Sequence, residues 1–72
     1  MKLLTVSYKT LETFMQQVNE LEADEVCVQI VSELPQRLHL TATVTQFLNV
    51  LGYYVKQNSH VTAQHLIFTK NQ

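Results

Sequence analysis

The chain is poor in the residues that cross-link, bend or loosen a small protein. Its 72 residues include one cysteine, one glycine, one proline and no tryptophan. With Cys27 alone, no disulfide can form within the chain, which excludes the cross-linked framework of small secreted proteins. The scarcity of glycine and proline beside 46% hydrophobic residues excludes a disordered linker. We therefore expect one packed domain over residues 1–72, because a chain this short has no room for a second core.

Long hydrophobic runs are also missing. Met1 to Leu4 begins like a signal peptide, but Thr5 and Ser7 interrupt it before an apolar region develops. No run approaches the roughly 18 apolar residues that span a bilayer. The expected protein is cytoplasmic, is not exported and has no membrane partner.

Positive charge is scarce and scattered. The chain has five basic residues and a formal net charge of −1, and most of its acidic residues fall between Glu20 and Glu33. A nucleic-acid-binding protein normally carries a basic stripe that meets the phosphate backbone. A nucleic-acid partner is therefore possible but not favoured.

No group of residues forms a recognisable catalytic or metal centre. The serines stand in no nucleophile-elbow context, and no glycine-rich loop could hold phosphate. Of the three histidines, His60 and His65 fall on opposite faces of a strand, and His39 lies far away in the sequence. We expect no catalytic residue, no cofactor and no metal, and hence no enzyme.

The first half of the chain has the pattern of a β-α-β unit. Residues 2–8 alternate apolar and polar side chains, which predicts a strand. Apolar residues then recur at helical spacing from Leu11 to Leu21, with Thr10 placed to cap the helix. Residues 25–32 are β-branched and alternating, which predicts a second strand parallel to the first, reached by a right-handed crossover. The residues expected to face the helix layer are Val26, Val28 and Ile30.

Residues 36–45 fit two patterns. Leu38, Leu40, Ala42 and Val44 alternate with polar residues as in a strand, which gives a hairpin, a helix over residues 45–57 and a ferredoxin-like β-α-β-β-α-β order. Alternatively, the stripe from Leu40 to Leu51 predicts a helix, followed by a hairpin of residues 53–57 and 65–70.

Gly52 favours the helical alternative. Glycine inside a helix costs about 1 kcal/mol, whereas just past a helix end it supplies the left-handed cap. The predicted fold is therefore a two-layer α+β sandwich of order β-α-β-α-β-β, with the ferredoxin-like order as the alternative.

Three segments carry a family resemblance. The run TVTQFLNVLGYYV (residues 43–55) resembles the second helix and following strand of the SirA/TusA family of small sulfur carriers. Members typically show an acidic helix cap, a branched apolar residue, an aromatic residue three positions later, and then glycine and a bulky residue opening a strand. Residues 21–35 are similar to the family's loop, second strand and acid-proline turn, and residues 65–70 resemble its closing strand. The resemblance implies a sulfur-carrier scaffold.

The sequence departs from that family at the working residue. In SirA/TusA proteins a Cys-Pro pair opens the first helix, whose amides stabilise a thiolate that carries persulfide sulfur. The corresponding stretch here is Ser7-Tyr8-Lys9-Thr10-Leu11, with neither cysteine nor proline. Cys27 does not replace it, because it lies in mid-strand with no helix terminus or local cation to lower its pKa. The resemblance therefore implies the scaffold without the sulfur chemistry.

One face of the predicted sheet has no helix to cover it. An exposed apolar patch of this kind usually marks an interface, so we expect self-association or docking to a protein partner there. Of two adjacent tyrosines in a strand, one faces inward and one outward. The candidate interface residues are Leu3, Cys27, Gln29, Val31, Tyr53 and Tyr54.

Three functional hypotheses follow. The first is a non-enzymatic protein-interaction or regulatory module on a SirA/TusA-like scaffold. The second is a degenerate sulfur-relay protein that binds relay partners without carrying sulfur. The third is a single-stranded nucleic-acid-binding protein, in which Tyr8, the outward tyrosine and Lys56 or Lys70 form a stacking platform.

Overall fold

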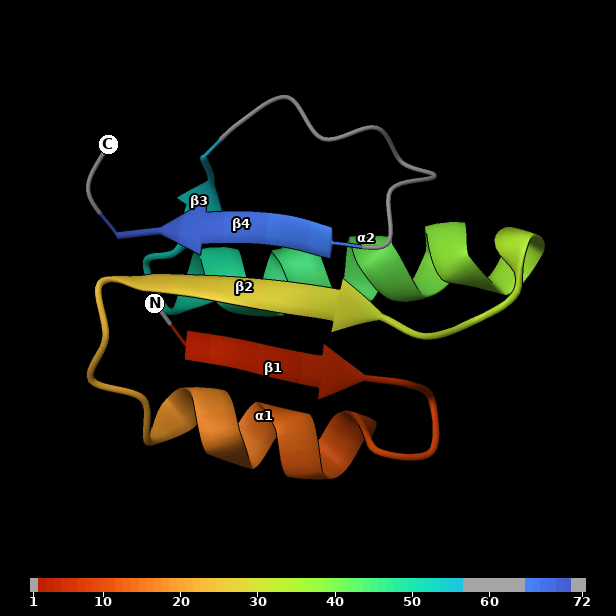
Figure 1. Ribbon diagram of the computed structural model, residues 1–72, viewed down its shortest axis with the longest axis horizontal. Helices are drawn as coiled ribbons and strands as arrows, with labels where there is room; N and C mark the ends of the chain where they lie inside the picture. The colour runs from red at the N-terminus through yellow and green to blue at the C-terminus, as the bar shows by residue number, and fades with distance from the viewer. Residues whose placement is uncertain (1, 57–64, 71–72) are drawn as a thin grey trace.

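The chain alternates strand and helix twice and then ends in two strands (Figure 1). The computed structural model describes residues 2–56 and 65–70. The two helices and four strands confirm the α+β class. The elements in chain order are β1 (Lys2–Val6), α1 (Leu11–Asn19), β2 (Glu25–Ile30), α2 (Leu34–Val50), β3 (Tyr54–Val55) and β4 (His65–Thr69).

The four strands form one mixed sheet in the order β1-β2-β4-β3. The strands β1 and β2 are parallel, as expected for strands joined by a helical crossover, and β4 is antiparallel to both β2 and β3. The last strand in sequence therefore lies inside the sheet, between β2 and the short edge strand β3. The other edge of the sheet is β1.

The hydrophobic core lies on one face of the sheet. In β2, Val26, Val28 and Ile30 are buried while Cys27 and Gln29 are half-buried, which confirms the predicted alternation. The helix α1 adds Phe14 and Val18 to this core, as its apolar stripe predicts. The remaining buried hydrophobic residues are Leu4, Val6, Leu40, Val44, Leu48, Tyr53, Leu66 and Phe68.

The helix α2 settles the two patterns of residues 36–45. These residues are helical, so the alternative that makes them a strand, with a hairpin just before it and a ferredoxin-like order, is wrong. The helix begins before Pro35, which sits in the first turn, where a missing N–H costs no hydrogen bond. Leu40, Val44 and Leu48 are fully buried, whereas Leu38 is 45% exposed. Burial of these three residues, spaced four apart along one side of the helix, therefore outweighs the strand-like alternation.

Gly52 ends α2 in the expected way. Its φ of 94° lies in the left-handed region, which glycine adopts without the steric cost of a Cβ. The amide of Tyr53 donates to the Leu48 carbonyl at 2.8 Å, and the amide of Gly52 donates to Asn49 O at 3.0 Å. These bonds satisfy carbonyl groups that the last turn leaves without helical partners. The chain then turns directly into β3.

Thr10 does not cap α1 as its sequence position predicts. It stands at the N-cap position, but its side chain makes no hydrogen bond to the helix. Its Oγ1 instead accepts the Ser7 amide at 3.0 Å, and the Thr10 amide donates to Ser7 O at 3.1 Å. Thr10 therefore closes the turn between β1 and α1.

Tyr53 is a buried structural residue. It is 1% exposed, and its hydroxyl donates to the Ala23 carbonyl at 2.6 Å. The Lys70 ammonium lies 5.1 Å from the centre of its ring. Burial raises the pKa of Tyr53, and the charge of Asp24 raises it further.

Tyr53→Phe is expected to lower the free energy of unfolding by about 1–2 kcal/mol at neutral pH, because Ala23 O loses its donor. The pKa of Tyr53 is higher in the folded state than in the unfolded state, so the neutral hydroxyl stabilises the fold fully at pH values below the unfolded-state pKa of about 10. This contribution is lost as the pH rises through the folded-state pKa. Urea unfolding from about pH 8 to 11 should therefore show a loss of stability that is smaller in Tyr53→Phe. Tyr54→Phe serves as the control, and an equal effect of the two variants would contradict the assignment.

Candidate functional site

The uncovered face of the sheet carries a row of apolar side chains across three strands. Leu3 of β1 pairs in register with Cys27 of β2, and Cys27 pairs with Ile67 of β4. Leu3 is 59% exposed, and the other two are half-buried. We call Leu3, Cys27 and Ile67 the apolar strip. In Figure 1 the viewer looks onto β2 and β4 from this side, with α2 behind them.

Polar groups border the apolar strip on both sides. On one side Thr5, Gln29 and His65 form the next row, in which Thr5 Oγ1 donates to Gln29 Oε1 at 3.5 Å. On the other side the Lys56 ammonium meets Glu25 Oε2 at 2.6 Å, across β4. This exposed pair adds little stability, at most about 1 kcal/mol, but it neutralises both charges on the face. An apolar centre with a polar rim is typical of protein–protein interfaces.

The structure brings together most of the residues proposed for this interface. Leu3, Cys27 and Gln29 share the face, and Tyr54 joins them at 42% exposure through its pairing with Thr69. Val31 lies just past β2 and is 49% exposed.

Tyr53 does not belong to this face. Tyr54 pairs with Thr69 on the uncovered side, so the preceding residue points into the core, and Tyr53 is buried there. Sequence analysis missed Ile67 for a related reason. Its alternation with Phe68 was visible in residues 65–70, but only the strand order places it beside Cys27.

The nucleic-acid stacking platform is not formed. Tyr8 follows the end of β1, and its hydroxyl donates to Gln36 O at 3.3 Å. Tyr54 lies near Glu25, at the start of β2, which is the opposite end of the sheet. Lys56 is engaged with Glu25. The two exposed tyrosines therefore cannot stack successive bases on one surface.

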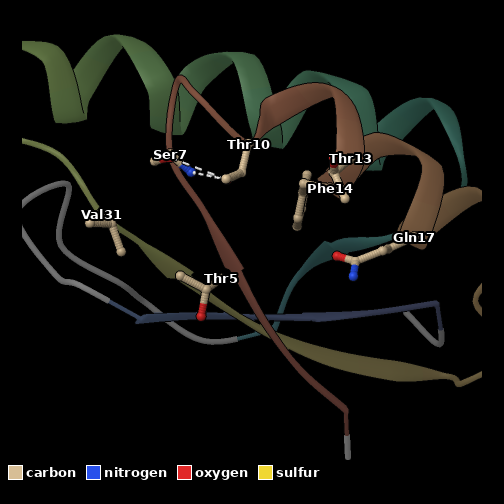
Figure 2. A pocket seen from close by; sticks show the side chains of 7 residues that line it. All are labelled: Thr5, Ser7, Thr10, Thr13, Phe14, Gln17 and Val31. Carbon is tan, nitrogen blue, oxygen red and sulfur yellow. Dashed lines mark hydrogen bonds between the residues drawn. The ribbon is translucent and has the colours of Figure 1, made fainter.

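A second surface feature runs along β1. One hollow of about 300 Å³ lies between the end of β1 and the start of α1, and another of about 320 Å³ lies at the opposite ends of the same two elements. Gln17 borders both hollows, and we call the two hollows together the groove beside β1. Figure 2 shows the first hollow, which is lined by Thr5, Ser7, Thr10, Thr13, Phe14, Gln17 and Val31.

The described residues offer no metal site. His39 on α2 and His65 on β4 are exposed on different elements, and His60 lies outside the described residues. Within residues 2–56 and 65–70, no three histidine, cysteine, aspartate or glutamate side chains gather closely enough to hold a metal ion. In the same residues, neither helix is long and apolar enough to cross a membrane.

Comparison of the chain with protein-family models, curated proteins and solved structures gives no match. The resemblance to the SirA/TusA family therefore stays a prediction.

Proposed function

We propose that this protein is a non-enzymatic interaction module that self-associates through the uncovered face of its sheet. The observation that carries the proposal is the apolar strip, which crosses three strands without a covering element among the described residues. Exposed apolar patches bordered by polar groups mark interaction surfaces, because their burial removes apolar area from water.

Charge and size favour a second copy of this chain as the occupant. Glu25 and Lys56 neutralise each other, so two identical faces meet without repulsion between like charges. The molecule measures 30 × 26 Å in its two longest directions, so one side of it has room for a contact approaching the ~800 Å² that each partner buries in a standard interface. Chains of this length also gain stability from oligomerisation, because they bury a small share of their surface alone.

The proposed scaffold is SirA/TusA-like without its sulfur chemistry. Two features support this proposal: a helix and a following strand occupy most of residues 43–55, and β4 covers residues 65–69, within the segment whose sequence resembles the family's closing strand. The turn that corresponds to the family's Cys-Pro pair is held by Ser7 and Thr10, and the only thiol lies on the uncovered face. These features support a binding role rather than sulfur transfer.

The position of Cys27 makes the proposal testable in the unmodified protein. It is the middle residue of the apolar strip, so a two-fold axis through the strip brings the two Cys27 side chains close together. Face-to-face sheets lie about 10 Å apart, a spacing that inter-sheet disulfides span in immunoglobulin domains.

Sedimentation velocity at micromolar concentrations is expected to show a monomer–dimer equilibrium. Oxidation with copper phenanthroline is expected to convert the dimer to a disulfide-linked species on non-reducing gels. Cys27→Ser should abolish the cross-link while the sedimenting dimer persists. A monomer at every concentration would overturn the proposal, and a dimer that neither oxidation nor a short bis-maleimide can cross-link would place the interface elsewhere.

A further inference from the structure

The strand β1 presents a free edge. It lies at the end of the sheet, and its only strand partner among the described residues is β2. The Val6 carbonyl accepts the Val31 amide at 2.9 Å, so the backbone groups of Val6 face β2. Because backbone groups alternate along a strand, those of Leu4 face β2 as well, and those of Leu3 and Thr5 face outward. Two residues therefore offer N–H and C=O groups that have no partner within the described chain.

The unpaired stretch has a defined end. The Ser7 amide is the next outward donor, and Thr10 Oγ1 accepts it at 3.0 Å, while Ser7 O accepts the Thr10 amide. The turn between β1 and α1 thus satisfies its own backbone groups. The hydrogen-bonding edge is limited to Leu3 and Thr5.

The helix α1 forms one wall of a groove along this edge. The first hollow reaches from Thr5, on the uncovered face, to Phe14 and Gln17 of α1 (Figure 2). The second hollow continues past Gln17 to Glu20 and Glu22. Thr5 lines the first hollow, and the neighbours of Leu3 in the chain, Lys2 and Leu4, line the second. Space therefore adjoins the unpaired backbone groups, which is what the addition of a strand requires.

We propose that this groove binds an extended peptide of a partner protein, which adds to β1 as a fifth strand. The peptide backbone exchanges hydrogen bonds with Leu3 and Thr5, and its side chains enter the hollows on either side of Gln17. The peptide would use backbone groups of Leu3 and Thr5 at the edge of the sheet, whereas the proposed dimer uses side chains on its face, so this inference does not rest on the proposed dimer.

A peptide fits the groove better than a second copy of the chain. The β1 strand of a copy carries its own α1 on the same side of the sheet, and this helix would meet the α1 that already borders the edge. A peptide without a helix avoids that overlap.

The charges at one end of the groove favour a basic residue in the peptide. Glu20 and Glu22 line the second hollow beside a single basic residue, Lys2. Neither carboxylate has an ion-pair partner among the described residues. The peptide therefore carries a basic residue at that end.

Selection from a random twelve-residue peptide library displayed on phage is the test. Selected peptides should be enriched in lysine or arginine, and their affinity for the wild-type protein is measured by fluorescence anisotropy. Thr5→Pro removes an outward N–H while leaving the β1–β2 hydrogen bonds in place, and proline is tolerated at such edge positions. Binding is expected to weaken about tenfold or more in this variant, since one lost hydrogen bond is worth about 1.4 kcal/mol when both groups are desolvated.

Val50→Asp is the control, because it changes an exposed side chain at the end of α2, a helix that lines neither hollow. It should bind the peptide as the wild type does. If Thr5→Pro fails to fold, amide exchange of the wild type decides: the Leu3 and Thr5 amides should exchange fast in the free protein and slowly with peptide bound. Selection that enriches no peptide, or peptide binding that leaves both amides unprotected, would overturn the proposal.

Discussion

Leu40→Ala is expected to lower the free energy of unfolding by about 2–5 kcal/mol, whereas Leu38→Ala should change it by less than about 1 kcal/mol. The two substitutions remove the same atoms from the same helix. Leu40 is fully buried in the core and Leu38 is 45% exposed. Only the first substitution therefore leaves a cavity in addition to the lost transfer free energy.

This pair also separates the two patterns of residues 36–45. In a strand, Leu38 and Leu40 would point to the same face, and the two substitutions would lower the free energy of unfolding by similar amounts. In the helix α2 they lie two residues apart and face different directions. Urea unfolding followed by circular dichroism measures both variants, and comparable losses would contradict the helical burial. Because small domains are stable by only about 5–15 kcal/mol, Leu40→Ala should also populate the unfolded state measurably on warming.

Leu3→Asp is expected to raise the dissociation constant of the dimer about 100-fold or more. The substitution places a carboxylate in the apolar strip, where association would take it out of water opposite apolar groups. A cost of about 3 kcal/mol or more for such a group corresponds to this change in affinity. Leu3 is 59% exposed on an edge strand, so the monomer fold should tolerate the change.

Val50→Asp provides the matched control for this experiment. Val50 is another exposed apolar residue, 83% exposed at the end of α2, and the same substitution there adds the same charge away from the sheet. Sedimentation velocity should find Val50→Asp dimeric and Leu3→Asp monomeric at the same concentration. If both variants dimerise as the wild type does, the apolar strip is not the interface.

Local pattern was sufficient for several elements of this protein. The alternation of residues 25–32 predicted which side chains of β2 are buried, and the apolar spacing after Thr10 predicted α1. Gly52 predicted where α2 ends, because a left-handed residue is a property of the local backbone. Each of these features depends on neighbours within a few positions, and a sequence displays such neighbours directly.

The local sequence pattern did not predict the structure where it was compatible with two different structures. Residues 36–45 alternate like a strand and also carry a helical stripe, and burial of Leu40 and Val44 against the sheet selected the helix. Thr10 is a residue type that often caps helices, but its hydroxyl accepts the Ser7 amide in the adjoining turn instead. Adjacent tyrosines must face opposite ways in a strand, yet only the pairing of Tyr54 with Thr69 decided which one is buried.

The sequence by itself determined the α+β class, because strand and helix patterns are properties of neighbouring residues. Only the tertiary structure decided what its surface offers. The strand order set Ile67 beside Cys27, joined Glu25 to Lys56 across β4 and left β1 at the edge beside α1. These arrangements depend on which distant strands pair, and that choice comes from burying the whole core at once, which no local window of sequence contains.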